Sequence, residues 1–262
     1  MNEGPDREGH LPLAYRNQEF LDTPDARSLR ILSEYLYPWS HFRKERIHDT
    51  IVFFGSARTL EMGLGGRYYT EARELARRVT EWSNGLHESS RRFVICSGGG
   101  PGIMEAANRG AHDAGGKTIG LNIGLNISLP FEQHVNEHVT QELAFEFHYF
   151  FMRKFWFMNL AQAMVVFPGG FGTLDELTEI LTLVQTQKLM KKIVVVLYGT
   201  SFWKEILNFD ALVRHGMIAE EDLQLFSFAD DVDAAFKLLE AGLTKYYLEP
   251  DREEPAIARS RI

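Results

Sequence analysis

Cysteine is almost absent from this chain, because Cys96 is the only one among 262 residues. A single cysteine excludes an internal disulfide and is typical of proteins that fold in a reducing compartment. Cys96 ends the apolar run 93–96, so we expect a small core residue there rather than a nucleophile. The first 20 residues are polar and lack an apolar core segment, so we expect no signal peptide and a cytoplasmic location.

Positive charge is in deficit. Lysine and arginine together number 28 against 36 aspartates and glutamates, which gives a formal net charge of −8. This balance disfavours a nucleic-acid partner. A small anionic ligand remains compatible with it, because a local cluster of backbone N–H groups can bind an anion whatever the net charge of the chain.

A long apolar run free of charge is also missing. The segment that most resembles a membrane span, residues 148–167, contains Arg153 and Lys154, and two adjacent cations inside a span would be strongly unfavourable. We therefore expect a buried helix over 148–160 that runs into a buried strand over 163–167, and no membrane partner.

Apolar runs alternate with amphipathic segments along the chain, which is typical of a parallel sheet covered by helices. We predict an α/β fold, a Rossmann-like doubly wound parallel sheet with helices on both faces, preceded by an N-terminal helical extension. The predicted domains are 1–47 for the partly helical extension, 48–248 for the nucleotide-binding catalytic domain and 249–262 for a charged tail. The predicted strands are 50–54, 93–96, 118–121, 139–145, 163–167, 193–197 and 226–229. The predicted helices are 25–46 with a kink or break at Pro38, 68–82, 103–114, 148–160, 177–189, 201–214 and 231–242.

The helix predicted in the extension has an apolar face. Its positions recur at helical spacing, and we expect this face to pack on the domain or on a neighbouring subunit. The face is formed by Leu29, Leu32, Leu36 and Trp39.

The run from Pro168 to Glu176, PGGFGTLDE, lies between a predicted strand and a predicted helix. Unpaired N–H groups and the helix dipole favour an anion at a helix N-terminus, and glycines let a ligand approach the backbone closely. The run therefore indicates a site for the phosphate of a small molecule, with Glu176 beside whatever the phosphate carries. Thr173 and Glu176 also fit a T-x-x-E capping box, in which Glu176 merely ties up the helix start.

Two further loops are expected at the same sheet edge, because ligands of open α/β sheets bind outside the carboxyl ends of the strands. They run from Gly55 to Arg58 and from Ser97 to Gly102. The second is not a dinucleotide fingerprint, since Ile103 stands where the third glycine belongs and the strand predicted next ends in no acidic residue. Residues 111–118 resemble a Walker A loop but lie between a helix and a strand, which is the wrong order. We therefore expect no cofactor. We also expect no metal, because the histidines show no convincing ligand spacing.

Three charged side chains near these loops each have two interpretations. Arg153 and Lys154 either serve the site or reach solvent and carboxylate partners, as cations in apolar surroundings usually do. Glu105, on the helix after the second glycine loop, either accepts a hydrogen bond from a ribose hydroxyl or faces solvent.

Taken together, these segments resemble the LOG-like Rossmann-fold proteins, long mislabelled as lysine decarboxylases. The family hallmark P-G-G-x-G-T-x-x-E is complete from Pro168 to Glu176, and an Arg-Lys pair begins at Arg153, at the family spacing. The Ser97 to Ala106 and Gly55 to Arg58 loops resemble the two other family segments. The stretch from Leu129 to Gln133 is more similar to the longer bacterial members than to the plant type.

The resemblance implies a nucleoside 5′-monophosphate phosphoribohydrolase that is a homodimer or a higher homo-oligomer. Such a hydrolase cleaves the N-glycosidic bond of AMP or of a cytokinin ribotide to the free base and ribose 5-phosphate. The alternative is a non-catalytic nucleotide-binding or molybdenum-cofactor carrier protein of the same fold. A third interpretation, amino-acid decarboxylation, needs a pyridoxal-binding lysine, and Lys154 is the only lysine near the motifs.

The catalytic pair that the resemblance implies is Arg153 and Glu176. We expect Glu176 to stabilise positive charge on the ribose and to activate water. We expect Arg153 to orient Glu176 or the ribose phosphate and to keep Glu176 ionised. The expected substrate-binding and phosphate-binding residues are Gly55, Ser56, Arg58, Ser97, Gly98, Gly99, Gly100, Gly102, Glu105, Lys154, Pro168, Gly169, Gly170, Phe171, Gly172 and Thr173.

Overall fold

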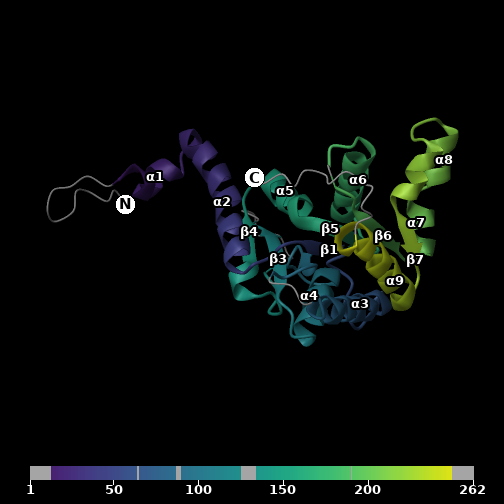
Figure 1. Ribbon diagram of the computed structural model, residues 1–262. Coiled ribbons are helices and arrows are strands. Elements are labelled where there is room, and N and C mark those ends of the chain that lie inside the picture. Colours follow the sequence, from purple (N-terminus) through teal and green to yellow (C-terminus); the bar gives the residue numbers. More distant parts are fainter. Residues whose placement is uncertain (1–12, 64, 87–89, 125–133, 190, 250–262) are drawn as a thin grey trace.

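Parallel strands form one seven-stranded sheet in the computed structural model, which describes residues 13–63, 65–86, 90–124, 134–189 and 191–249 (Figure 1). The strands are β1 (Thr50–Phe54), β2 (Val94–Ser97), β3 (Thr118–Ile123), β4 (Ala144–Phe147), β5 (Ala161–Val166), β6 (Val194–Tyr198) and β7 (Ser227–Ala229). Their order is β4-β3-β2-β1-β5-β6-β7, and each neighbouring pair is parallel. The predicted α/β fold with a parallel sheet is confirmed.

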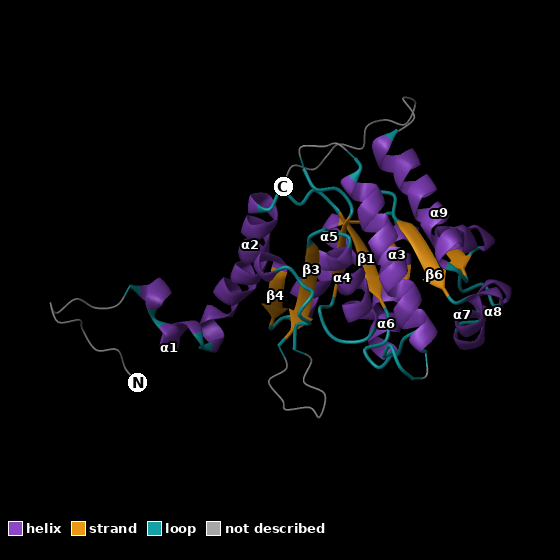
Figure 2. Ribbon diagram, turned by 90° about the horizontal axis from the view of Figure 1, so that it is seen from below, coloured by secondary structure: helices purple, strands orange, loops and turns teal. Residues whose placement is uncertain are grey.

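Helices cover both faces of the sheet (Figures 1 and 2). One face packs against α3 (Gly66–Asn84), α4 (Ile103–Asp113) and α9 (Val232–Leu243), and the other against α2 (Arg27–Lys44), α5 (Phe150–Leu160), α6 (Phe171–Gln185) and α7 (Thr200–Ile206). The remaining helices are the short α1 (Gln18–Leu21) and α8 (Phe209–Arg214). Turns of 3₁₀ helix span Ala14–Arg16, Pro24–Ala26, Gln141–Leu143 and Glu220–Leu225, and a π turn spans Thr244–Leu248.

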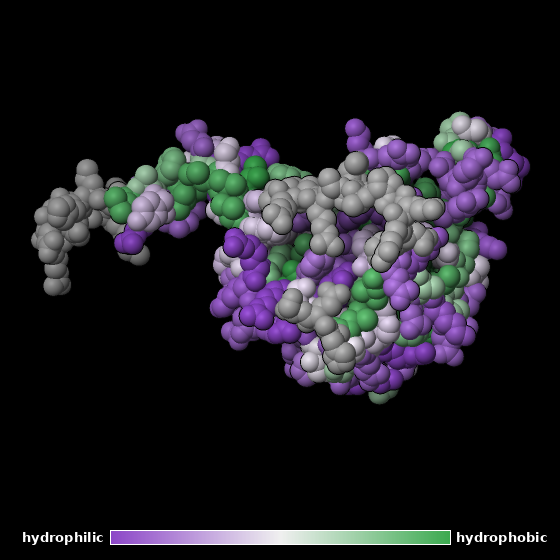
Figure 3. Space-filling view, viewed as in Figure 1, coloured by the Kyte–Doolittle hydropathy of each residue, from purple (hydrophilic) through white to green (hydrophobic). Residues whose placement is uncertain are grey.

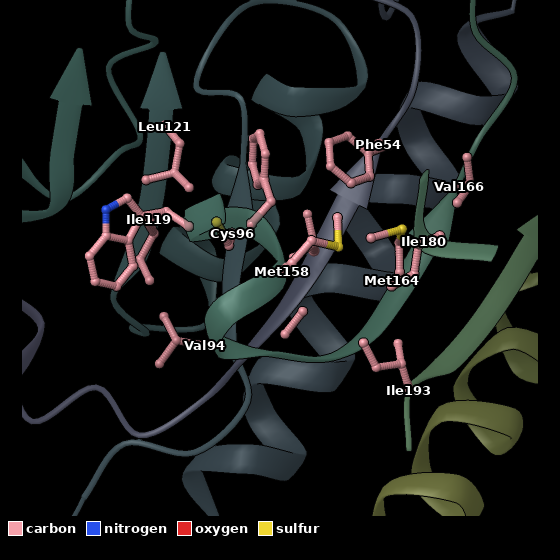
Figure 4. Packing of buried hydrophobic residues seen from close by; sticks show 14 of the residues in the cluster. Phe54, Val94, Cys96, Ile119, Leu121, Met158, Met164, Val166, Ile180 and Ile193 are labelled. Carbon is pink, nitrogen blue, oxygen red and sulfur yellow. The ribbon is translucent and has the colours of Figure 1, made fainter. Parts of the chain in front are cut away.

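Alternation along the strands divides the core into two layers. Ile51 and Phe53 face the layer under α3, α4 and α9, whereas Val52 and Phe54 face the layer under α5 and α6. Figure 4 shows the second layer, where Cys96 lies among buried apolar side chains. Cys96 is 2% exposed and burial raises the pKa of its thiol, so its prediction as a core residue is confirmed.

The helix of the PGG run begins at Phe171 rather than at Leu177 and ends at Gln185 rather than at Leu189. Gly170 takes the N-cap position, so Gly172 lies in the first helical turn instead of in the preceding loop. The helix ends early because Gln187 adopts a positive φ of 53°. The last six residues of the motif are therefore helical.

Three other predictions of secondary structure are wrong in part. Of the kink or break expected at Pro38, the break is absent, because α2 continues through this residue. The strand expected over 139–145 is a 3₁₀ turn followed by β4, since Thr140 is tied to Thr118 through its side chain and its backbone N–H. The helix expected over 201–214 is two helices, because Asn208 caps α8 by accepting a hydrogen bond from the Ala211 N–H (2.9 Å).

The apolar segment 148–167 contains α5 and β5, as predicted. Within the described ranges, none of the helices has the length and apolarity needed to cross a membrane. The likeness of residues 129–133 to longer family members lies outside the described residues, and so does the predicted tail 249–262 beyond its first residue.

Candidate active site

The candidate site lies at the point where the strand order reverses. The chain runs outward from β1 to β4 on one side and from β5 to β7 on the other, so β1 and β5 are neighbours at the centre of the sheet. A crevice forms outside the carboxyl ends of the strands at such a reversal. The loops after β1, β2 and β5 all leave the sheet at this edge, as predicted from their positions in the sequence.

Backbone hydrogen bonds join these three loops. The Ser56 N–H donates to the Pro168 carbonyl (3.0 Å), and the Ile103 N–H donates to the Ser56 carbonyl (3.1 Å). Gly102 has a φ of +70°, and a Cβ added there would lie 2.3 Å from the Ser56 carbonyl oxygen. Only glycine therefore allows the second loop to pack so closely against the first.

The Ser97–Gly102 loop is held by two asparagines that sequence reasoning missed. Ser97 Oγ donates to Asn108 Oδ1 (2.7 Å) and accepts from the Gly99 N–H (3.0 Å). Asn136 Nδ2 donates to the carbonyls of Gly99 (2.9 Å) and Gly100 (3.0 Å). Asn136 also donates to Asn108 Oδ1 (3.0 Å), so one network fixes the loop from behind.

The start of α6 presents free backbone donors. Its first i→i−4 bond runs from the Leu174 N–H to the Gly170 carbonyl (3.0 Å), so the N–H groups of Phe171, Gly172 and Thr173 have no acceptor within the helix. A Cβ added at Gly172 would meet nothing within 4 Å, and the Phe171 side chain is 92% exposed. These donors suit an anion such as a phosphate.

Glu176 lies buried in α6, and among the residues that the structure describes Arg153 is the only cation within 4 Å of its carboxylate. Glu176 Oε1 lies 3.9 Å from Arg153 Nη2. Within the described part of the chain, neither Glu176 oxygen has a hydrogen-bond partner, nor does Arg153 Nε. The capping-box alternative for Glu176 is therefore wrong, since a capping glutamate would accept from the N-cap N–H.

Burial raises the pKa of Glu176 from its ordinary 4.5 to about 7, although the charges of Lys154 and Arg153 act in the opposite direction. Arg153 therefore favours the ionised carboxylate, in the direction expected from the sequence, but burial has the larger effect. Arg153 itself stacks over the ring of Phe150 (4.6 Å to the centroid), which supports a guanidinium in apolar surroundings.

Lys154 pairs with α6 rather than facing open space. Its Nζ lies 2.6 Å from Asp175 Oδ2 and 2.8 Å from Glu179 Oε2. Burial alone would lower the pKa of Lys154, but these two hydrogen-bonded carboxylates raise it above its ordinary value. Lys154 thus joins α5 to α6 through the carboxylates that precede and follow Glu176 in the sequence.

The remaining candidates lie around this centre. Glu105 is half-buried and accepts a hydrogen bond from the Tyr69 hydroxyl (2.8 Å), so it has a protein partner on α3. Arg58 is exposed, and its N–H donates to Ser56 Oγ (3.0 Å). The Thr173 side chain covers Gly169, where an added Cβ would lie 2.1 Å from Thr173 Oγ1. A search of the described ranges finds no group of three histidines, cysteines or carboxylates that could hold a metal.

Comparison with known proteins gives related sequences. A profile of the family described as possible lysine decarboxylase matches residues 104–239, more than half of the chain. The cytokinin riboside 5′-monophosphate phosphoribohydrolase LOG of Oryza sativa subsp. japonica is 29% identical over 180 residues, 68% of this chain and 67% of the rice protein. The Arabidopsis thaliana protein of the same description, LOG2, is 26% identical over 204 residues, 78% of this chain and 87% of that protein.

Among solved structures, the structural-genomics target TM1055 has a TM-score of 0.51 at 18% identity, covering 74% of this chain and 99% of that chain. This similarity supports the fold alone. The family match is more specific, because residues 104–239 include Arg153 and the whole PGG run. The chain therefore belongs to the family described as possible lysine decarboxylase, to which the LOG-like motifs in its sequence also point.

Proposed function

We propose that this protein hydrolyses the N-glycosidic bond of a nucleoside 5′-monophosphate, AMP or a cytokinin ribotide, to the free base and ribose 5-phosphate. The observation that carries this proposal is the Glu176 carboxylate. It is 2% exposed and 3.9 Å from Arg153, and it has no hydrogen-bond partner among the described residues. The described activity of the two plant relatives supports the same reaction class.

Binding begins at the phosphate. The N–H groups of Phe171, Gly172 and Thr173 at the start of α6 bind the phosphate oxygens, and the helix dipole adds to this attraction. The Ser97–Gly102 loop, held by Asn136, lies over the ribose. We propose that the C1′ atom of the bound ribose lies on the side of Glu176 and Arg153.

Hydrolysis breaks the bond between C1′ and the base nitrogen, and the bonding electrons leave with the base. Positive charge builds up on the ribose, as in other glycoside hydrolyses, and the ionised Glu176 stabilises it. A water oxygen then forms the new bond to C1′, Glu176 accepts the proton of this water, and the base nitrogen takes up a proton from solvent. A pKa of about 7 suits that role, because a general base is most effective when its pKa is near the working pH.

The residues argue against the other two interpretations. A carrier would need the glycine loops, but it would gain nothing from a buried carboxylate without a partner, which destabilises the fold. A decarboxylase of the pyridoxal type would need a neutral lysine amine to form the Schiff base. Lys154 is instead kept protonated between Asp175 and Glu179.

The test is to incubate the purified protein with AMP and to measure free adenine by chromatography. Glu176→Gln keeps the shape of the side chain and removes its charge, so we expect turnover to fall by at least ~100-fold. Glu205→Gln, at an exposed position on α7, is the matched control and should match the wild type. Adenine release by a folded Glu176→Gln protein at the wild-type rate would refute the role of Glu176. AMP binding without release by the wild type would favour a carrier.

We also propose that the protein is a homodimer or a higher homo-oligomer, as the family resemblance implies. Association would cover apolar surface that one chain leaves exposed. Figure 3 shows such surface along the N-terminal helices, where Leu29, Leu32 and Leu36 of α2 are each about half exposed.

A further inference from the structure

Helix α5 carries Arg153 but has no cap of its own. Its N-cap residue is Tyr149, whose side chain makes no capping hydrogen bond, and its first turn contains no acidic residue. A helix start usually has a serine, threonine, aspartate or asparagine to accept from its free N–H groups. The start of α5 must therefore be held in place by contacts with other elements.

Glu34, a residue of α2, binds the start of α5. Its Oε1 accepts from the His148 N–H (2.7 Å), and its Oε2 accepts from the Tyr149 N–H (3.2 Å). A carboxylate at this end of a helix is also favoured by the helix dipole. Glu34 of α2 thus holds the N-cap residue of α5 and the residue before it.

The backbone of Glu34 makes a third contact with α5. Pro38 has no N–H, so the Glu34 carbonyl loses the donor that an α-helix normally supplies four residues later. Trp156 Nε1, on α5, donates to this carbonyl instead (3.0 Å). Pro38, at which the sequence predicts a kink or break in the helix, therefore frees a backbone acceptor for α5.

Aromatic contacts hold the same tryptophan in place. The Trp156 ring stacks on Tyr35 (5.5 Å between centroids) and on Trp39 (6.2 Å), and it meets Phe42 edge-on (5.2 Å). Trp156 is 1% exposed and lies one helical turn from Arg153. Glu34 and Trp156 thus join α5 to α2, as Lys154 joins α5 to α6, and both contribute to where Arg153 lies.

We propose that Glu34 of α2 is a positioning residue that holds α5 so that the Arg153 guanidinium reaches Glu176. The inference rests on the proposed hydrolase function and assigns the N-terminal helix a part in building the site. Small displacements of a reacting group are enough to slow an enzyme strongly, with about 1 Å corresponding to about 100-fold. The effect on the reaction is thus expected to exceed the effect on overall folding.

The first test measures hydrogen exchange, which does not depend on turnover. Glu34→Ala leaves the His148 and Tyr149 N–H groups without an acceptor, so we expect exchange in residues 150–160 to be faster and exchange in 171–185 to be unchanged. Glu34→Gln keeps one acceptor oxygen, so exchange in its residues 150–160 should be faster than in the wild type and slower than in Glu34→Ala. Ser33→Ala, the exposed neighbour on α2, is the control. Unchanged exchange across 150–160 in both Glu34 variants would overturn the proposal.

The second test uses the pH profile of AMP hydrolysis. If Arg153 moves away, Glu176 loses a neighbouring cation, so the rising limb of kcat/KM should move to higher pH, as it should in Arg153→Met. We expect kcat of Glu34→Ala to fall about 10-fold or more. Loss of folded protein alone would lower the measured rate but would not shift the pH dependence of kcat/KM. Trp156→Phe keeps an aromatic ring and removes the Nε1 donor. It replaces Glu34→Ala in both tests if Glu34→Ala does not fold.

The two tests separate the inference from the function beneath it. The positioning role would be overturned if folded Glu34→Ala had the kcat of the wild type and the same pH dependence of kcat/KM. A wild-type protein that releases no base would refute the hydrolase function, and the exchange result would then decide whether Glu34 places α5.

Discussion

At the scale of single residues, Glu176 is stabilised poorly by its surroundings. Its carboxylate is buried, its oxygens have no hydrogen-bond partner within the described part of the chain, and Arg153 is 3.9 Å away. A folded protein keeps such a group at the expense of stability. This is the pattern expected where a side chain is held ready for a reaction rather than for packing.

A stability measurement tests this directly. The pKa of Glu176 in the folded state is about 7, above its ordinary 4.5, so the folded protein holds this proton more tightly than the unfolded chain does. The free energy of unfolding should therefore fall as the pH rises from about 4.5 to about 7, by up to on the order of 3 kcal/mol. Glu176→Gln lacks this loss, so its melting temperature should exceed that of the wild type at pH ~8 and match it at pH ~5. Equal melting temperatures at both pH values would contradict the raised pKa.

At the scale of elements, the site depends on how closely three loops pack. Gly102 and Gly115 both have positive φ, +70° and +68°, but only Gly102 has neighbours within 4 Å. Gly102→Ala should destabilise the fold by clashing with Ser56 in addition to the strain of its φ, which alone is of order 1–3 kcal/mol. Gly115→Ala carries the φ strain without the clash and is the matched control.

Chemical denaturation of the two alanine variants gives the comparison. We expect the midpoint to fall further in Gly102→Ala than in Gly115→Ala, and AMP binding to weaken only in Gly102→Ala. Equal midpoints and equal affinities would mean that the Ser97–Gly102 loop does not need its close approach to Ser56.

The elements also show what the sequence could and could not predict. The order of strands and helices and the place of the PGG run follow from local patterns of apolar residues and glycine. The contacts that set the site are not local: Glu34 is 114 residues from His148, and Asn136 is 37 residues from Gly99. No periodicity or spacing marks such partners, so sequence reasoning named Arg153 and Glu176 but missed Asn136 and Glu34. It also misplaced the start of α6, because Gly172 suggested a loop where the structure has a helical turn.

At the scale of the whole molecule, the N-terminal helix α2 has two apolar sides. Ile31, Tyr35 and Trp39 pack against the core, whereas Leu29, Leu32 and Leu36 face outward. The sequence predicts Trp39 on the same face as these leucines, and the structure separates them, since Trp39 stacks on Trp156. The extension thus belongs to the fold on one side and leaves exposed apolar surface on the other.

Sedimentation of the purified chain tests whether that surface is covered by association. A chain of 30.0 kDa that forms a homodimer or a higher homo-oligomer should sediment with at least twice that mass at micromolar concentration. A mass of a single chain across the whole concentration range would contradict the proposed association.

The products of the reaction with AMP give the most direct test of the proposed function. We predict that the wild-type protein releases adenine and ribose 5-phosphate in equal amounts, and that Glu176→Gln binds AMP but releases neither product at a comparable rate. Bound AMP that stays intact with the wild-type protein, or equal product release by Glu176→Gln, would contradict the assignment of Glu176 and Arg153 to N-glycosidic hydrolysis.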